Sequence, residues 1–136
     1  MRQPGYFAQY HGMVHRVPFV GAGEWVAITS PVEPDEIATA YPDALEIGVG
    51  RDDVPWLKLP RSSLERYFIV RVDATWHGEP VWIQGVGENG LVGIGYLGSS
   101  EFGRKHGLVG QEREGYFGEV PEVELRDIKV TEKDLL

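Results

Sequence analysis

The chain has 136 residues and a net charge of −8, with 21 acidic and 13 basic side chains. This balance argues against nucleic acid and anionic membranes as partners, because binding to them depends on a surplus of Lys and Arg. The chain has no cysteine, which excludes disulfides, thiolate metal sites and cysteine nucleophiles. Eighteen glycines and nine prolines punctuate short apolar runs, and this pattern predicts an all-β fold with many turns.

The first half alternates apolar and polar residues, as half-buried strands do. A hairpin turn is expected at His11-Gly12 and another turn at 21–23, because glycine tolerates positive φ. Acidic residues precede helix formers before Pro42, which predicts a short helix that Pro42 ends. The expected elements are strands at 5–10, 13–19, 24–29, 45–47 and 54–59, a helix at 34–41 and a helical or 3₁₀ turn at 62–65.

The second half begins with the longest β-like run, residues 67–76. A second short helix is expected at 99–106, because Ser99 stands where an N-cap belongs and Gly107 can end the helix in the left-handed conformation. Further strands are expected at 80–84, 91–97, 116–120 and 128–130, with a helical turn at 122–127, and residues 131–136 are expected to fray or to form a short tail.

A repeat organises these elements. The segment Ala8–Gly12 (AQYHG) recurs in similar form as Ala74–Gly78 (ATWHG), and Leu59-Pro60 recurs as Val120-Pro121. We therefore predict two pseudo-duplicated SH3-like small barrels, each with one short helix, at residues 1–69 and 70–136. No flexible Gly/Ser linker lies near residue 70, so we expect the two barrels to pack as one body.

No motif specifies a reaction. Residues Gly85–Gly90 match GxGxxG, but a strand is expected to follow them instead of the helix that a nucleotide site needs, so they predict a hairpin. His77-Gly78-Glu79 lacks the cysteines of a zinc deaminase, and the histidines before glycine are better explained as turn residues. No serine lies in a Gly-x-Ser-x-Gly elbow. We expect a non-enzymatic protein without metal or cofactor.

The candidate partner-binding residues are aromatic and acidic. Trp56 stands beside Asp52 and Asp53, an arrangement that suits an interface anchor for a basic partner; the alternative is that Trp56 packs inside, like its counterpart Phe117. Trp25 and Trp82 are expected in the core. An acidic run supplies three further candidates or forms a solvated face; its candidate members are Glu112, Glu114 and Glu119.

The repeated segments Tyr6–Gly12 and Val72–Pro80, together with Gly115–Pro121 and Glu124-Leu125, resemble small actinobacterial proteins. These look like the acidic immunity-type partners of secreted polymorphic toxins. The resemblance implies a cytoplasmic, toxin-inhibiting protein that occludes a basic toxin domain, and the absence of an apolar run in residues 1–20 agrees with that location. The alternatives are a small-molecule-binding protein or enzyme with a site in a cleft between the two units, near Trp56, Trp76 and Trp82, and a module that docks extended peptides.

Overall fold

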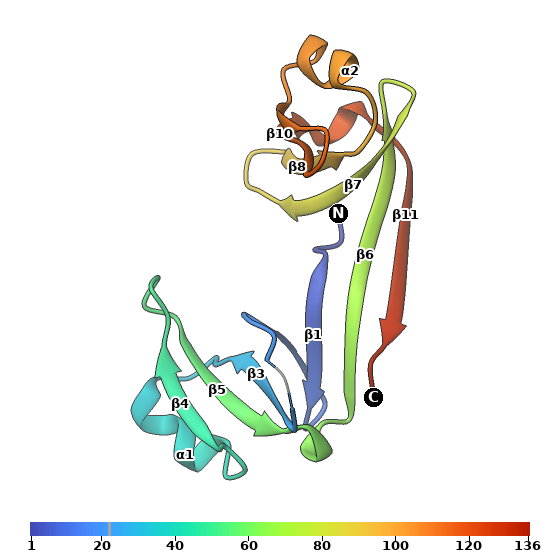
Figure 1. The fold of residues 1–136 in the computed structure, drawn as a ribbon. Coiled ribbons are helices and arrows are strands. Elements are labelled where there is room, and N and C mark those ends of the chain that lie inside the picture. The colour runs from blue at the N-terminus through green and yellow to red at the C-terminus, as the bar shows by residue number, and fades with distance from the viewer. Residues whose placement is uncertain (22) are drawn as a thin grey trace. The chain divides into compact units, whose positions relative to one another are not determined.

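The part of the chain that the structure describes is mostly β, with an eight-stranded sheet, a three-stranded sheet and two short α-helices (Figure 1). The computed structural model describes residues 1–21 and 23–136. The chain divides into two compact units: the N-terminal unit comprises residues 5–69 and 133–136, and the C-terminal unit comprises residues 1–4 and 70–132. The turn expected at 21–23 includes Ala22, which lies outside the described residues.

The N-terminal unit begins with a hairpin of β1 and β2, in which Phe7 faces Arg16 and Tyr10 faces Met13. Its three-stranded sheet has the order β3-β5-β4 and is antiparallel. The elements are β1 (Gly5–Tyr10), β2 (Met13–Arg16), β3 (Trp25–Thr29), η1 (Pro34–Glu36), α1 (Ile37–Ala40), β4 (Glu46–Val49), β5 (Pro55–Pro60) and η2 (Arg61–Ser63), followed by β6 (Arg66–Trp76), which continues into the other unit.

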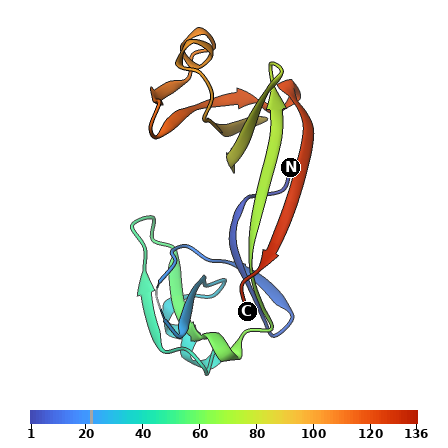
Figure 2. The same ribbon diagram turned by 45° about the vertical axis from the view of Figure 1, so that its right-hand side comes forward.

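The C-terminal unit continues the larger sheet, whose order is β2-β1-β6-β7-β8-β10-β9, with β11 also paired to β6. The paired strands β6 and β11 lie side by side, as the second view of the chain in Figure 2 also shows. The elements after β6 are β7 (Glu79–Val86), β8 (Leu91–Tyr96), α2 (Ser100–Lys105), β9 (Val109–Gln111), β10 (Gly115–Pro121), η3 (Glu122–Glu124) and β11 (Leu125–Asp134).

The same order of elements occurs twice. Three strands, a short helix, two strands and a 3₁₀ turn run from β1 to η2, with the additional 3₁₀ turn η1 directly before the helix, and the same series without η1 runs from β6 to η3. The repeated His-Gly turns also agree: φ is +49° at His11 and +80° at Gly12, and +48° at His77 and +80° at Gly78. The prediction that these histidines are turn residues is therefore confirmed, because both dipeptides adopt the left-handed conformation that a tight hairpin requires.

Several local predictions are confirmed. The GxGxxG match begins in the last two residues of β7 and continues through the connection to β8, with positive φ at Asn89 and Gly90. The Ser99 side chain accepts a hydrogen bond from the Phe102 backbone N–H at 3.2 Å, and φ is +80° at Gly107. Both ends of α2 were therefore predicted correctly from the sequence, because cap residues act through local geometry.

The strands differ from the prediction in three places, and the first is that the strand expected at 13–19 ends at Arg16. The tail expected to fray is ordered as far as Asp134, because β11 pairs with β6 and the backbone N–H of Leu135 donates to Tyr67 O at 2.7 Å. The short strand β9 was not predicted; it pairs with β10, and Gly110 lies opposite Tyr116. Both segments expose most of their side chains, so neither carries the apolar alternation from which strands are predicted.

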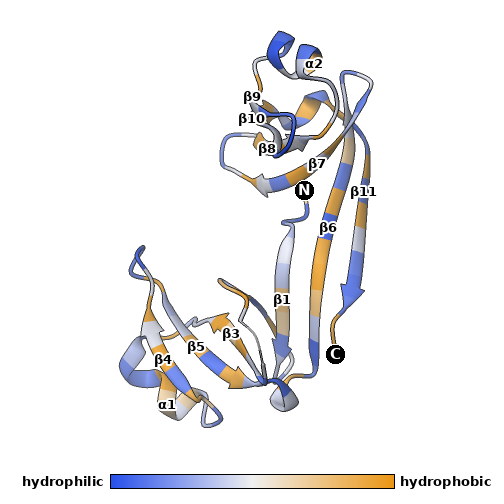
Figure 3. Cartoon of the chain, viewed as in Figure 1, coloured by the Kyte–Doolittle hydropathy of each residue, from blue (hydrophilic) through white to orange (hydrophobic). Residues whose placement is uncertain are grey.

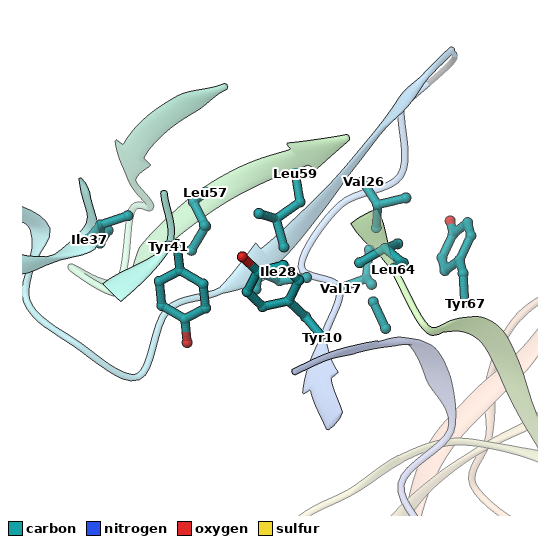
Figure 4. Close-up of a cluster of buried hydrophobic side chains, with 11 residues drawn as sticks. Tyr10, Val17, Val26, Ile28, Ile37, Tyr41, Leu57, Leu59, Leu64 and Tyr67 are labelled. Carbon is teal, nitrogen blue, oxygen red and sulfur yellow. The ribbon is translucent and has the colours of Figure 1, made fainter. Parts of the chain in front are cut away.

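The core of the N-terminal unit lies between the three-stranded sheet and the first hairpin. Figure 4 shows it, with Leu57 and Leu59 of β5 pointing towards Ile28 and Tyr10. Leu57, Leu59 and Ile28 are completely buried. Tyr10 keeps its hydroxyl satisfied by donating to Asp43 Oδ2 at 3.0 Å. One face of the β3-β5-β4 sheet therefore packs in the core, and its other face lies at the surface of the unit.

The buried His15 should make stability depend on pH. Its side chain is 7% exposed, and its Nε2 has no hydrogen-bond partner among the described residues. Burial lowers the pKa of His15 below its ordinary value of 6.5, against an opposing interaction with the Thr29 backbone. Because the folded state then binds its proton less readily than the unfolded state, this group stabilises the fold above pH 6.5, and the contribution is lost as pH falls.

We therefore expect the free energy of unfolding to fall between about pH 7 and pH 5, more steeply in the wild type than in His15→Gln, which cannot titrate. Urea unfolding at a series of pH values measures both slopes. His11→Gln is the matched control, since His11 is an exposed turn residue, and it should keep the wild-type slope. Equal slopes for the wild type and His15→Gln would contradict the assignment.

Candidate functional site

The outer face of the three-stranded sheet in the N-terminal unit carries a group of partly exposed aromatic rings. The register places Trp56 opposite Thr29 and Gly48, and Lys58 opposite Ala27 and Glu46. These side chains point away from the core that Leu57 and Leu59 occupy, because neighbouring residues of a strand face opposite sides. We call the group of Phe19, Trp25, Trp56 and Lys58 the aromatic face.

The rings of the aromatic face contact one another and a lysine. The Phe19 ring contacts the Trp56 ring edge to face, with the ring centroids 5.1 Å apart. It contacts the Trp25 ring in the same way, with the centroids 6.2 Å apart. The Lys58 ammonium lies 4.1 Å from the centroid of the Trp25 ring and 5.8 Å from that of Trp56. Glu46 holds the same ammonium at 2.7 Å. Cation–π attraction and this ion pair together fix the indoles at the surface.

Glycine allows Trp56 to lie flat on the sheet. A Cβ built on Gly48, the residue directly opposite Trp56, would come within 2.2 Å of the indole ring. The indole thus covers the backbone of β4 where any other residue would collide with it. The C-terminal unit uses the same device: Trp82 lies opposite Gly95 and covers it, and a Cβ there would also come within 2.2 Å of the ring.

We expect Gly48→Ala to displace the Trp56 indole and to lower the free energy of unfolding by about 1–3 kcal/mol, the usual effect of overpacking. The shift of the Trp56 indole N–H resonance and urea unfolding measure the two effects. Gly85→Ala is the matched control, since Gly85 also lies in a strand but a Cβ there would have no neighbouring heavy atom within 4 Å. Indistinguishable behaviour of the two variants would show that Gly48 does not seat the indole.

A cavity of about 700 Å³ opens beside the aromatic face, within the N-terminal unit. Its apolar wall consists mainly of Phe19 and Trp56 with Pro18 and Pro55, and Arg16, Arg51 and Asp52 supply its charged groups. Phe19 is 38% exposed. Such a volume and a mainly apolar lining with a few polar groups are typical of ligand sites and of pockets for anchor side chains.

The turn between β4 and β5 positions the charged groups. The Gly50 backbone N–H donates to Val54 O at 2.9 Å, and that of Val54 donates to Asp52 Oδ1 at 3.3 Å. Asp53 has a φ of +61°, a conformation that aspartate tolerates better than most residues. Figure 3 shows this hairpin with a hydrophilic tip above a hydrophobic stretch of chain. Arg51 and Asp52 are thereby held at the rim of an apolar cavity.

The predicted site residues fall in two separate units. Asp52 and Trp56 line the same cavity, and Asp53 is exposed in the same turn. Glu112, Glu114 and Glu119 belong to the C-terminal unit. Glu112 lines a small polar recess of about 250 Å³ with Arg104, whereas Glu114 and Glu119 are exposed on the β9–β10 turn and on β10.

Sequence reasoning missed Phe19, Trp25 and Arg16. Trp25 was expected in the core but is only half-buried, because it lies on the outer face of β3. The alternation of β3 and β5 places Trp25 and Trp56 on one face once the two strands are paired, but the pairing was not predicted. Trp82 is likewise half-buried, whereas Trp76 is a core residue at 3% exposure.

The C-terminal unit has a second aromatic cluster, around Trp76. The imidazoles of His77 and His106 stack with centroids 4.5 Å apart, and His106 also contacts Phe102 and Trp76. Burial, then His77 and Lys105, lower the pKa of His106. Glu124 receives the Trp76 indole N–H at 3.0 Å and lies 3.5 Å from His77 Nε2. The cluster attaches α2 to β6 and has the character of a packing element.

Comparisons with known protein families, curated proteins and solved structures give no match. Across residues 1–21 and 23–136 no three His, Asp or Glu side chains are grouped to hold a metal ion. None of the helices in that same part of the chain is long and apolar enough to cross a membrane.

Proposed function

We propose that this chain is a non-enzymatic protein-binding module and that the aromatic face with its cavity is the docking site. The observation that carries the proposal is the partial exposure of Phe19 and Trp56 beside a cavity of about 700 Å³. Tryptophan and arginine are enriched among residues that dominate binding energies, and both stand at this site. The Lys58–Glu46 pair and Gly48 hold the indole in place before any partner arrives, which reduces the entropy lost on binding.

The more specific form of the proposal is an immunity protein that occludes a toxin domain in the cytoplasm. It is supported by the resemblance of the repeated segments to immunity-type proteins and by the net charge of −8. An acidic chain attracts a basic toxin domain at long range and raises the association rate. Glu112, Glu114 and Glu119 would contribute to that field from the C-terminal unit, while Asp52 and Asp53 lie beside the docking cavity.

The repeated order of elements supports a separate proposal about the origin of the fold. We propose that the two units arose by duplication of an SH3-like unit. The recurring order of elements and the recurring left-handed His-Gly turns support this. Edges of such small units need cover, and pairing of β11 with β6 supplies it for one strand.

A small-molecule-binding function is the second candidate, and the cavity volume favours it. A largely apolar space of about 700 Å³ is within the range of small-ligand sites. Of the three tryptophans first considered for such a site, Trp56 lines this cavity, whereas Trp76 is buried against α2. Native mass spectrometry of the purified chain would reveal a retained small molecule.

Affinity capture from the native host tests the protein-binding function. The wild-type chain should capture one protein in stoichiometric amount, and a variant that combines Phe19→Ala with Trp56→Ala should lose it. Trp82→Ala is the matched control, because Trp82 covers Gly95 as Trp56 covers Gly48, and it should retain the partner. Capture of no specific protein, or equal capture by all three chains, would refute the proposed docking site.

A further inference from the structure

The charged groups at the cavity differ in how far they are already engaged. Asp52 accepts a hydrogen bond from the Val54 backbone, and Lys58 is held by Glu46. In contrast, Arg16 and Arg51 are also lining residues of the cavity, and their side chains make no hydrogen bond or ion pair to another of the described residues. In a chain with eight more acidic than basic groups, the charged residues that line the cavity are two arginines and one carboxylate, that of Asp52.

Lys58 limits the access of another cation to the faces of the Trp25 and Trp56 indoles. Lys58 lies 4.1 Å from the Trp25 centroid and 5.8 Å from the Trp56 centroid, so the chain's own ammonium already occupies the position that a partner's lysine would take. At that position a second cation would meet repulsion from the Lys58 ammonium. The aromatic face is therefore unsuited to a cationic anchor.

We infer that the cavity receives an anionic anchor: a bulky apolar side chain of the partner, next to a carboxylate that Arg16 and Arg51 bind. This inference rests on the proposed function and identifies the chemistry of the docking segment. Guanidinium groups suit carboxylates because they donate paired hydrogen bonds. Phe19 and Trp56 supply the apolar contact, and their edge-to-face contact leaves ring surface for an aromatic or aliphatic group.

A partner with a net positive charge can still present a carboxylate to the cavity. The charge of −8 acts over about a Debye length, roughly 8 Å at physiological salt, and governs encounter. Contacts within the cavity act at hydrogen-bond distance and govern selection of the docking segment. A basic domain that presents an acidic, apolar segment would satisfy both conditions.

Two probes of the same shape and opposite charge test this inference on the purified chain: 3-phenylpropanoate and 3-phenylpropylamine. Titrations followed by the indole N–H resonances should show the carboxylate binding about tenfold more tightly, as one charge-assisted hydrogen bond predicts. The preference should fall towards unity when Arg16→Gln and Arg51→Gln are combined. Arg104→Gln in the C-terminal unit is the matched control and should keep the wild-type preference.

Equal binding of the two probes, preference for the ammonium, or no binding of either would overturn the inference. So would a carboxylate preference that persists in the double arginine variant. None of these results depends on capture of a partner, so the inference can fail while the protein-binding function stands. Conversely, a carboxylate preference without any captured protein would support the cavity chemistry and transfer it to the small-molecule candidate.

Discussion

Replacing Trp76 by alanine is expected to lower the free energy of unfolding by about 3–5 kcal/mol, the largest effect of any single substitution considered for this chain. Trp76 is 3% exposed and packs edge to face against Phe102 of α2, with centroids 5.9 Å apart. Its indole N–H donates to Glu124. The substitution would leave a cavity beneath α2 and remove that hydrogen bond together, and urea unfolding measures the sum.

Trp76→Phe is a milder substitution. It keeps one six-membered aromatic ring and loses the N–H together with the smaller ring of the indole, so we expect a smaller loss of about 1–2 kcal/mol. The exposed Val109, also in the C-terminal unit, provides a surface control: Val109→Ala should change stability by less than about 0.5 kcal/mol. A Trp76→Ala variant as stable as the Val109→Ala variant would show that the cluster around α2 does not support the fold.

The second large effect concerns binding. Trp56→Ala is expected to weaken binding of the captured partner by about 30-fold or more, which corresponds to the 2 kcal/mol that defines a binding hot spot. The indole lines the cavity and contacts Phe19, so its removal takes away the apolar wall against which an anchor side chain would pack. Isothermal titration calorimetry with the purified partner measures the change in Kd.

The comparison requires that the variant remains folded. Trp56 is only half-buried on the outer face, so its loss should lower stability less than Trp76→Ala does. Trp82→Ala serves again as the control and should bind within about threefold of the wild type. If Trp56→Ala and Trp82→Ala weaken binding equally, the aromatic face is not the docking site.

Local structure was largely predictable from the sequence because it depends on neighbouring residues. The His-Gly turns, the cap at Ser99 and the Asn89-Gly90 turn each follow from backbone preferences at one or two positions. The tail at 131–136 could not be predicted in the same way. Its charged, exposed residues are ordered by pairing of β11 with β6, which is a contact between segments far apart in the sequence.

The candidate site was only partly predictable for the same reason. Trp56, Asp52 and Asp53 are neighbours in sequence, and proximity alone suggested them. Phe19 and Arg16 join Trp56 only when the chain after β2 meets the β4–β5 hairpin. Alternation shows that a strand has two faces, but which tryptophan faces the core depends on which sheet face is covered, and that is a tertiary property.

Amide hydrogen exchange of the chain with and without its captured partner tests the central claim most directly. We expect slower exchange on binding around residues 16–19 and in the β4–β5 hairpin from Glu46 to Trp56, because these segments border the aromatic face and its cavity. Protection confined to the C-terminal unit, such as the acidic β9–β10 turn, with unchanged exchange at 16–19 and 46–56, would contradict it.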